Sequence, residues 1–199
     1  MSYSSTSWTT DGLTQAGSSG TTTMGGITLY ADFFVGSYES SSFGAETHEM
    51  LVFNSANYSS LALNPNLGTG TDPATTFTTA DSNGARASDI VPCLWYVPDN
   101  ITIDSVYSLE GADQATGDTT RMHLMSYTFT SGSTSCLTSG AVLASNSDVT
   151  NAGSEQAYLS TWTVNSSSVA AGKVDVATFR SDTINSDYSM NVRVKYHLS

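Results

Sequence analysis

Five acidic residues near the middle of the chain have the side-chain types and spacing that could support chemistry. They form two groups, Asp99 with Asp104, and Glu110 with Asp113 and Asp118. Two carboxylates held at a fixed separation can hydrolyse a glycosidic bond, and the second group could instead supply oxygen ligands to Ca²⁺. Its spacing matches no calcium-loop motif, however. Because Asp and Gly are typical of exposed turns, we interpret both groups as turn residues and predict no catalytic or metal site.

The remaining reactive side chains are three histidines and two cysteines. His48, His123 and His197 are scattered along the sequence, which favours ordinary surface or interface positions over metal ligation. Cys93 and Cys136 lack zinc-binding or Cys-x-x-Cys spacing, so we predict two free thiols made in a reducing cytoplasm. The sequence also has no Gly-x-Ser-x-Gly elbow and no phosphate-binding loop. We therefore expect a protein that is not an enzyme and needs no cofactor.

The elements that would position these residues are short strands rich in β-branched and aromatic side chains, separated by Gly, Pro, Asp and Asn. The central one, 101–109, should place Ile101, Ile103, Tyr107 and Leu109 on one face. The intervals are too short for crossover helices, which favours an all-β antiparallel sandwich or jelly roll. The predicted strands are 28–35, 49–53, 92–97, 101–109, 120–129, 141–144, 156–164, 173–180 and 189–198.

The organisation predicted for the chain is an N-terminal arm or stem over 1–88, with short strands, and a sandwich over 89–199. Residues 1–28 are mostly Ser, Thr and Gly, a composition that needs an outside partner to become ordered. The turn-rich passage 54–89 is long for a loop of a compact domain. We therefore interpret it as an extended arm or an excursion over a neighbouring subunit.

Composition excludes several classes of partner. The net charge is −12 and only 12% of residues are charged, which argues against nucleic acid and anionic membranes. No apolar run is long enough to span a bilayer, and the start is not a secretory signal. With 33 Ser and 28 Thr among 199 residues, the surface must be hydrated by hydroxyl groups more than by charges.

Several short phrases resemble a known group of proteins. They are Pro-Asp-Asn-Ile-Thr-Ile-Asp at 98–104, Thr-Gly-Asp-Thr-Thr at 116–120, Ala-Gly-Lys-Val at 171–174 and Asp-Tyr-Ser-Met-Asn-Val-Arg-Val-Lys-Tyr at 187–196. Over about residues 90–198 the chain resembles a β-sandwich of tailed-bacteriophage virion proteins, particularly those of marine and cyanobacterial phages. The Gly/Thr-rich phrase at 20–28 is similar to the stems of trimeric phage fibres and spikes.

This resemblance implies a homotrimeric structural subunit on the capsid or tail of a virion. Strand 120–129 supports a trimer independently, because it is apolar on both faces and needs a second cover. We therefore expect a capsid decoration (cement) protein whose partners are itself and the major capsid protein or another virion protein. The alternative is a receptor-binding fibre or spike head whose exposed Trp and Tyr stack on host glycan. The expected trimer or capsid contacts are Trp8, Leu29, Tyr30, Phe33, Phe34, Met125, Tyr127 and Phe129.

Overall fold

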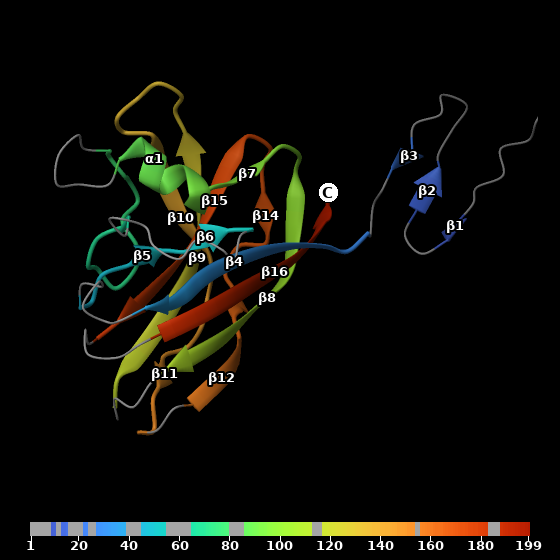
Figure 1. Ribbon diagram of the computed structural model, residues 1–199. Coiled ribbons are helices and arrows are strands. Elements are labelled where there is room, and N and C mark those ends of the chain that lie inside the picture. Colours follow the sequence, from blue (N-terminus) through green and yellow to red (C-terminus); the bar gives the residue numbers. More distant parts are fainter. Residues whose placement is uncertain are drawn as a thin grey trace, which may run out of the picture.

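The chain folds into two antiparallel β-sheets that pack face to face (Figure 1). This computed structural model describes residues 9–10, 13–15, 22–23, 27–38, 45–54, 65–79, 86–112, 117–153, 156–182 and 188–199. Eight strands form the framework: β4 (Leu29–Tyr38), β5 (Glu49–Met50), β8 (Ile101–Ala112), β9 (Thr119–Phe129), β10 (Leu137–Ser145), β12 (Gln156–Thr161), β15 (Lys173–Ser181) and β16 (Tyr188–Leu198).

The strand order confirms the predicted all-β sandwich. One sheet, here called the β8 sheet, runs β12-β8-β16-β4 and ends at β6 (Val52–Phe53), with β14 (Ser168–Val169) beside β8. The other, the β9 sheet, runs β10-β9-β15-β5, with β13 (Thr163–Val164) beyond β10. It also includes β7 (Trp95–Val97) beside β15 and β11 (Val149–Thr150) beside β9. From β4 to β9 and from β11 to β16, strands that follow one another in the chain alternate between the two sheets, whereas β9, β10 and β11 lie in the same sheet.

The sandwich begins much earlier in the chain than the predicted boundary near residue 88. Strand β4 pairs with β16 along most of its length, and β5 and β6 pair with β15 and β4. Figure 1 shows β4, β16 and β8 side by side. The division into a 1–88 arm and an 89–199 sandwich is therefore wrong for these strands. Alternate residues of β4 and most of the apolar residues of 49–53 are buried within their own subunit, which their sequence pattern did not distinguish from burial between subunits.

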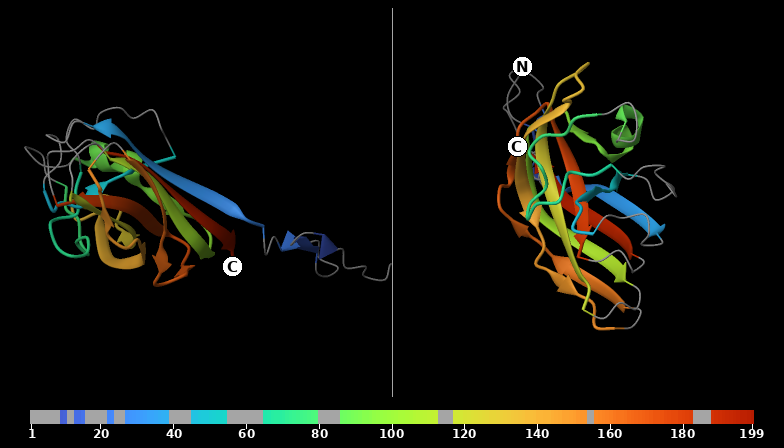
Figure 2. Two further views of the ribbon diagram at one scale, coloured as in Figure 1. Left: turned by 90° about the horizontal axis from the view of Figure 1, so that it is seen from below. Right: turned by 90° about the vertical axis from the view of Figure 1, so that its left-hand side faces the viewer.

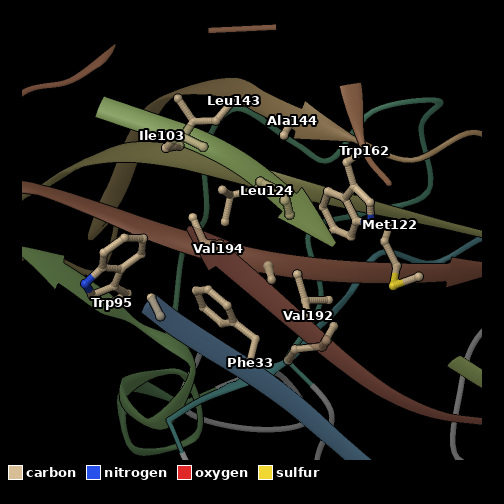
Figure 3. Packing of buried hydrophobic residues seen from close by; sticks show 14 of the residues in the cluster. Phe33, Trp95, Ile103, Met122, Leu124, Leu143, Ala144, Trp162, Val192 and Val194 are labelled. Atoms are coloured by element: carbon tan, nitrogen blue, oxygen red, sulfur yellow. The ribbon is translucent and has the colours of Figure 1, made fainter. Parts of the chain in front are cut away.

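The space between the sheets is filled by large apolar side chains (Figure 3). Phe33 from β4, Met122 and Leu124 from β9, and Val192 from β16 are almost completely buried there. Burying one such side chain contributes about 1.5–3 kcal/mol, so this layer supplies most of the driving force for closing the sandwich.

One tryptophan closes the side of the sandwich. Trp162 lies between β12 and β13, where the chain passes from one sheet to the other. Its indole N–H donates a hydrogen bond to Ser108 Oγ at 2.9 Å. The predicted strand 156–164 is thus two strands in different sheets. The predicted strand 92–97 also differs, because it starts inside a short helical segment made of α1 (Ala87–Ile90) and η2 (Val91–Cys93) before β7 begins.

A second apolar cluster lies on the outer side of the β9 sheet. Residues 65–79, here called the strap, cross this side, and Leu67 and Phe77 pack with Met125 and Tyr127 of β9. Tyr127 donates its hydroxyl hydrogen to the carbonyl oxygen of Ala74 at 2.7 Å. The segment α1–η2 contributes Ile90 and Cys93 to the same cluster.

The strap corrects two expectations drawn from the sequence. Its described residues cover their own subunit rather than a neighbour, and they supply the second cover that β9 needs. The close approach is possible because residue 140 is glycine, since a Cβ there would lie 3.0 Å from Cα of Thr75. The two apolar faces of strand 120–129 are thus both covered within one subunit and do not call for a trimer.

Near the N-terminus, three very short strands form a small antiparallel sheet of their own. They are β1 (Thr9–Thr10), β2 (Leu13–Gln15) and β3 (Thr22–Thr23). This sheet lies apart from the sandwich in Figure 1 and in the left view of Figure 2. Trp8, a predicted contact residue, lies outside the described residues.

Candidate functional site

The outer face of the β8 sheet, the side turned away from the β9 sheet, carries an unusual concentration of exposed apolar side chains. Leu159 on β12 is 71% exposed and Leu109 on β8 is 56% exposed, and these two residues are direct cross-strand neighbours. Tyr107 on β8 and Tyr30 on β4 are exposed on the same face. These are four of the seven large exposed apolar residues in the part of the chain that the structure describes. Leu159, Leu109 and Tyr107 form what we call the ridge.

A β-bulge brings the ridge to the surface. Tyr196 of β16 pairs with Ile103, whereas Lys195 pairs with Ser105, so Asp104 is an extra residue in β8. An extra residue shifts the side-chain alternation by one position. Ile101 and Ile103 consequently face the core, while Tyr107 and Leu109 face outward. The prediction that these four residues share one face was wrong for this reason.

Shallow hollows lie on both sides of the ridge. One, of about 350 Å³, is lined by the small residues Gly111, Ala157 and Ser189 together with Leu109. The other, of about 280 Å³, lies between the ridge and Arg193. The outer face is therefore uneven as well as apolar. A sheet face that contacts only water needs neither property.

Two ion pairs lie on the outer face. Arg193 on β16 forms a two-contact ion pair with Asp32 on β4, at 2.7 and 3.1 Å. Its guanidinium carbon also lies 5.5 Å from the centre of the Tyr30 ring. The hydrogen bond from Arg193 to Asp32 raises the pKa of Arg193. On the same side, His197 Nδ1 lies 2.9 Å from Asp104 Oδ1.

Two histidines that are far apart in sequence meet beneath the strap. His48 and His123 are completely buried, with ring centres 5.0 Å apart in an edge-to-face arrangement. His48 Nε2 lies 2.9 Å from the carbonyl oxygen of Gly70, and His123 Nε2 lies 3.4 Å from Asp72 Oδ1. Burial lowers the pKa of both, that of His123 to about 4 with further lowering from His48.

This arrangement contradicts the surface or interface positions predicted for the histidines, since only His197 is partly exposed. No sequence signal could have found the pair, because only the fold brings residue 48 next to His123 of β9. Among the residues that the structure describes, no three His, Cys, Asp or Glu side chains converge on a possible metal site.

Of the predicted group Glu110, Asp113 and Asp118, the structure describes Glu110 and Asp118, and these two have different polar partners. Glu110 is buried and accepts a hydrogen bond from Thr120 Oγ1 at 2.7 Å, and burial raises its pKa to about 7. Asp118 lies 3.4 Å from the Tyr188 hydroxyl, and Asp113 lies outside the described residues. The exposed-turn interpretation was therefore wrong for Glu110, which the bulge in β8 turns inward.

The other predicted pair consists of exposed residues. Asp99 is exposed in the turn between β7 and β8, and Asp104 is the bulge residue that pairs with His197. Both fit the turn or solvent-facing positions expected from the sequence. Cys93 and Cys136 are free and buried in the cluster beneath the strap, which confirms the prediction of free thiols. Burial raises the pKa of the Cys93 thiol to about 12, so this thiol is unreactive at neutral pH.

A polar hollow of about 480 Å³ opens beside the strap and the end of β10. Arg121 of β9 forms an ion pair across it with Asp148, at 3.2 Å. The other lining residues are Asp72, Val142, Ser145, Asn146, Ser147, Thr163 and Asn165. Charged, amide and hydroxyl groups such as these can hydrogen-bond a polyhydroxylated ligand, although none of the described residues that line the hollow is aromatic.

The residues predicted to contact other subunits differ widely in accessibility. Phe33, Met125 and Tyr127 are buried inside their own subunit, so as folded they cannot make such contacts. Leu29 and Phe34 are partly buried, and Tyr30 and Phe129 are exposed. Of these, Tyr30 and Phe34 lie on the outer face of the β8 sheet.

Comparison with known proteins adds no relative: no family model and no curated protein sequence matches the chain. Within the described residues, no helix combines the length and apolar composition that crossing a bilayer requires. The candidate functional site is therefore defined by the geometry of the outer face alone.

Proposed function

We propose that this chain is a non-enzymatic structural subunit of a tailed-bacteriophage virion, which decorates the shell and stabilises it by assembling through the outer face of the β8 sheet. The observation that carries the proposal is the ridge, a contiguous apolar surface on a sandwich whose interior is already filled. Large exposed apolar patches on soluble proteins mark surfaces that other molecules cover. The phage resemblance of the sequence supplies the proposed setting.

The mechanism of stabilisation would be burial of surface shared between subunits. Covering a fully exposed Leu or Tyr contributes about 1.5–3 kcal/mol, so one ridge would contribute a few kcal/mol per contact after the cost of association. A shell carries many such contacts, and a subunit that binds only the assembled state shifts the equilibrium toward it. The net charge of −12 would keep decorated particles apart in solution.

The test is a binding measurement with the full chain and bare capsids of the phage that encodes it. We expect saturable loading at a fixed number of copies per capsid, and a higher temperature of capsid disruption once the sites are filled. The variant Leu159→Asp should reduce loading, because it places a charge in the ridge. Failure of the wild-type chain to bind bare capsids at any concentration would contradict decoration.

Glycan recognition is a second candidate, and the polar hollow is the observation that favours it. Of the Trp and Tyr residues expected from the sequence to stack on sugar rings, Trp95 and Trp162 are buried, whereas Tyr30, Tyr96 and Tyr107 are exposed. Binding in the polar hollow would use the Arg121–Asp148 pair and its neighbours. Host-cell adhesion that is lost in Arg121→Ala and retained in Leu159→Asp would favour this candidate over decoration.

A further inference from the structure

The shape, charge and extent of the outer face point to one occupant. We propose that a second copy of this chain binds there across a twofold axis, with the ridge of each copy packed into the hollow formed by Gly111, Ala157 and Ser189 of the other. The inference rests on the proposed function only in treating the outer face as an assembly surface. It names the partner, which the proposed function leaves open.

Shape is the first argument. The ridge pair Leu109 and Leu159 and the hollow pair Gly111 and Ala157 are neighbouring cross-strand pairs on the same two strands, β8 and β12. Outward-facing residues two apart on a strand are separated by about 7 Å. A twofold axis passing between these two rows would place the protruding row of one copy over the recessed row of the other. Such self-complementarity is what a twofold interface requires.

Charge is the second argument. The chain carries 18 acidic and 6 basic residues, so most of its surface repels another copy. The outer face is different, because Arg193 is paired with Asp32 and Lys195 lies next to Arg193 on the same side of β16. Two of the six basic residues are thus on this face. It is a surface on which two such acidic molecules can meet without strong repulsion.

Extent is the third argument. Four strands spaced about 4.8 Å apart and about seven residues long give a flat footprint of roughly 450 Å². Stable interfaces bury about 800 Å² per partner, and weak ones bury less. The expected dimer is therefore a weak one, with a dissociation constant in the micromolar range. The outward residues of β12 (Ala157, Leu159 and Thr161) are uncharged, so the edge of the face puts no charged side chain in the way of the partner.

The experiment is sedimentation of the full chain from about 1 µM to about 200 µM, a range that brackets weak dimer formation. We expect a concentration-dependent shift from monomer to dimer. Leu159→Asp and Ala157→Tyr should each weaken the dimer by about tenfold or more, the first by charging the ridge and the second by filling the hollow. Both sites are exposed in the monomer, so near-UV circular dichroism should show that the fold is retained.

The matched control for Leu159→Asp is Tyr96→Asp. Tyr96 lies on β7 of the β9 sheet and is 60% exposed, compared with 71% for Leu159. The Tyr96 variant should leave the dimer intact. A wild-type chain that stays monomeric at the highest concentration would overturn the inference. So would a trimer, or a dimer that tolerates both outer-face variants. Capsid loading by a monomeric chain would leave the proposed function standing and this inference refuted. A dimer that does not bind capsids would support this inference and contradict the proposed function.

Discussion

At the scale of single residues, the most costly feature of the sandwich is an acid buried within it. Asp175 on β15 is completely buried, opposite Ser126 of β9 and Trp95 of β7. Burial raises the pKa of Asp175 to about 7, and the Ser126 hydroxyl opposes this only partly. In the unfolded chain the carboxyl ionises near its ordinary value of 3.8. A pKa that is raised by folding means that the stabilisation present at low pH is lost as the pH rises toward 7.

Replacing this acid should therefore stabilise the protein at alkaline pH. We expect Asp175→Asn to raise the free energy of unfolding by about 2–4 kcal/mol at pH 8, and by clearly less at pH 5. Urea denaturation at the two pH values measures the difference. The exposed Asp99→Asn serves as the control and should change stability little at either pH. If Asp175→Asn instead lowered stability at pH 8, the assigned cost of the buried carboxylate would be contradicted.

The residues of the candidate site show where sequence reasoning stops. The sequence pattern predicted most of the strands, apart from the differences at 92–97 and 156–164, and alternation correctly placed Met190, Val192 and Val194 on one face of β16. It failed on β8, because the bulge at Asp104 exchanges the inward and outward positions of the residues that follow it in this strand. Nothing in the local sequence marks Asp104 as the bulged residue, since the pairing with β16, more than 80 residues later, determines the bulge.

At the scale of elements, the strap is fastened to the sandwich by backbone hydrogen bonds at both ends and by a few buried side chains. Its backbone joins β5 and β10 through hydrogen bonds such as those from Leu67 to His48 and from Gly140 to Thr75. Its apolar anchors are Leu67 and Phe77. Arg180 of β15 reaches the carbonyl oxygen of Gly70 at 3.0 Å, beside the buried histidine pair.

The strap should loosen in acid. The pKa of His123 is about 4 in the folded protein, below the ordinary value of 6.5. Folding stability from this group is therefore full above pH 6.5 and falls as the pH drops toward 4. The groups that act on the pair are Glu46, Asp72, Arg121 and Arg180. Buried cations at His48 and His123 would repel each other and the two arginines.

Hydrogen exchange at pH 7 and pH 4.5 measures this loosening, once intrinsic exchange rates are corrected. We expect the amide protection of Leu67 and Phe77 to fall about tenfold or more relative to that of Val192 in the core. The variant His123→Gln should reduce the pH dependence, and the partly exposed His197→Gln should not. Equal loss of protection in the strap and the core would show that acid acts on the whole fold instead.

The sequence could not have located the strap. Residues 65–79 contain two large apolar anchors among turn residues, a pattern also expected of an arm that binds a neighbour. Which surface such a segment covers depends on the apolar outer side of β9, and that side is visible only after the sheet is assembled. The burial of Met125 and Tyr127 follows from the same tertiary contact.

At the scale of the whole molecule, net charge and the neutral outer face oppose each other. A charge of −12 repels a second copy over distances of about one Debye length, roughly 10 Å at 0.1 M salt. The apolar ridge acts only at contact. Self-association should therefore strengthen as salt screens the long-range repulsion, in contrast to an interface held by ion pairs.

Sedimentation in about 20 mM and about 300 mM NaCl tests this expectation, since the Debye length shortens severalfold over that range. We expect the dimer dissociation constant to fall at the higher salt concentration. The variant Arg193→Ala, which removes the cation that pairs with Asp32, should weaken the dimer most at low salt. A dimer that dissociates as salt is added would show that charge pairs, rather than the ridge, hold the copies together.

The order in which the strands leave the ribosome has a consequence for folding. Strand β16 lies between β4 and β8, yet it follows both in the chain, so the β8 sheet stays divided until residues 188–198 are made. At a translation rate of about 5–20 residues per second, β4 therefore remains without its neighbour β16 for roughly ten seconds or more. During that interval the nascent chain exposes the same surfaces that would later form its core, and its yield in the cell should depend on whatever shields them.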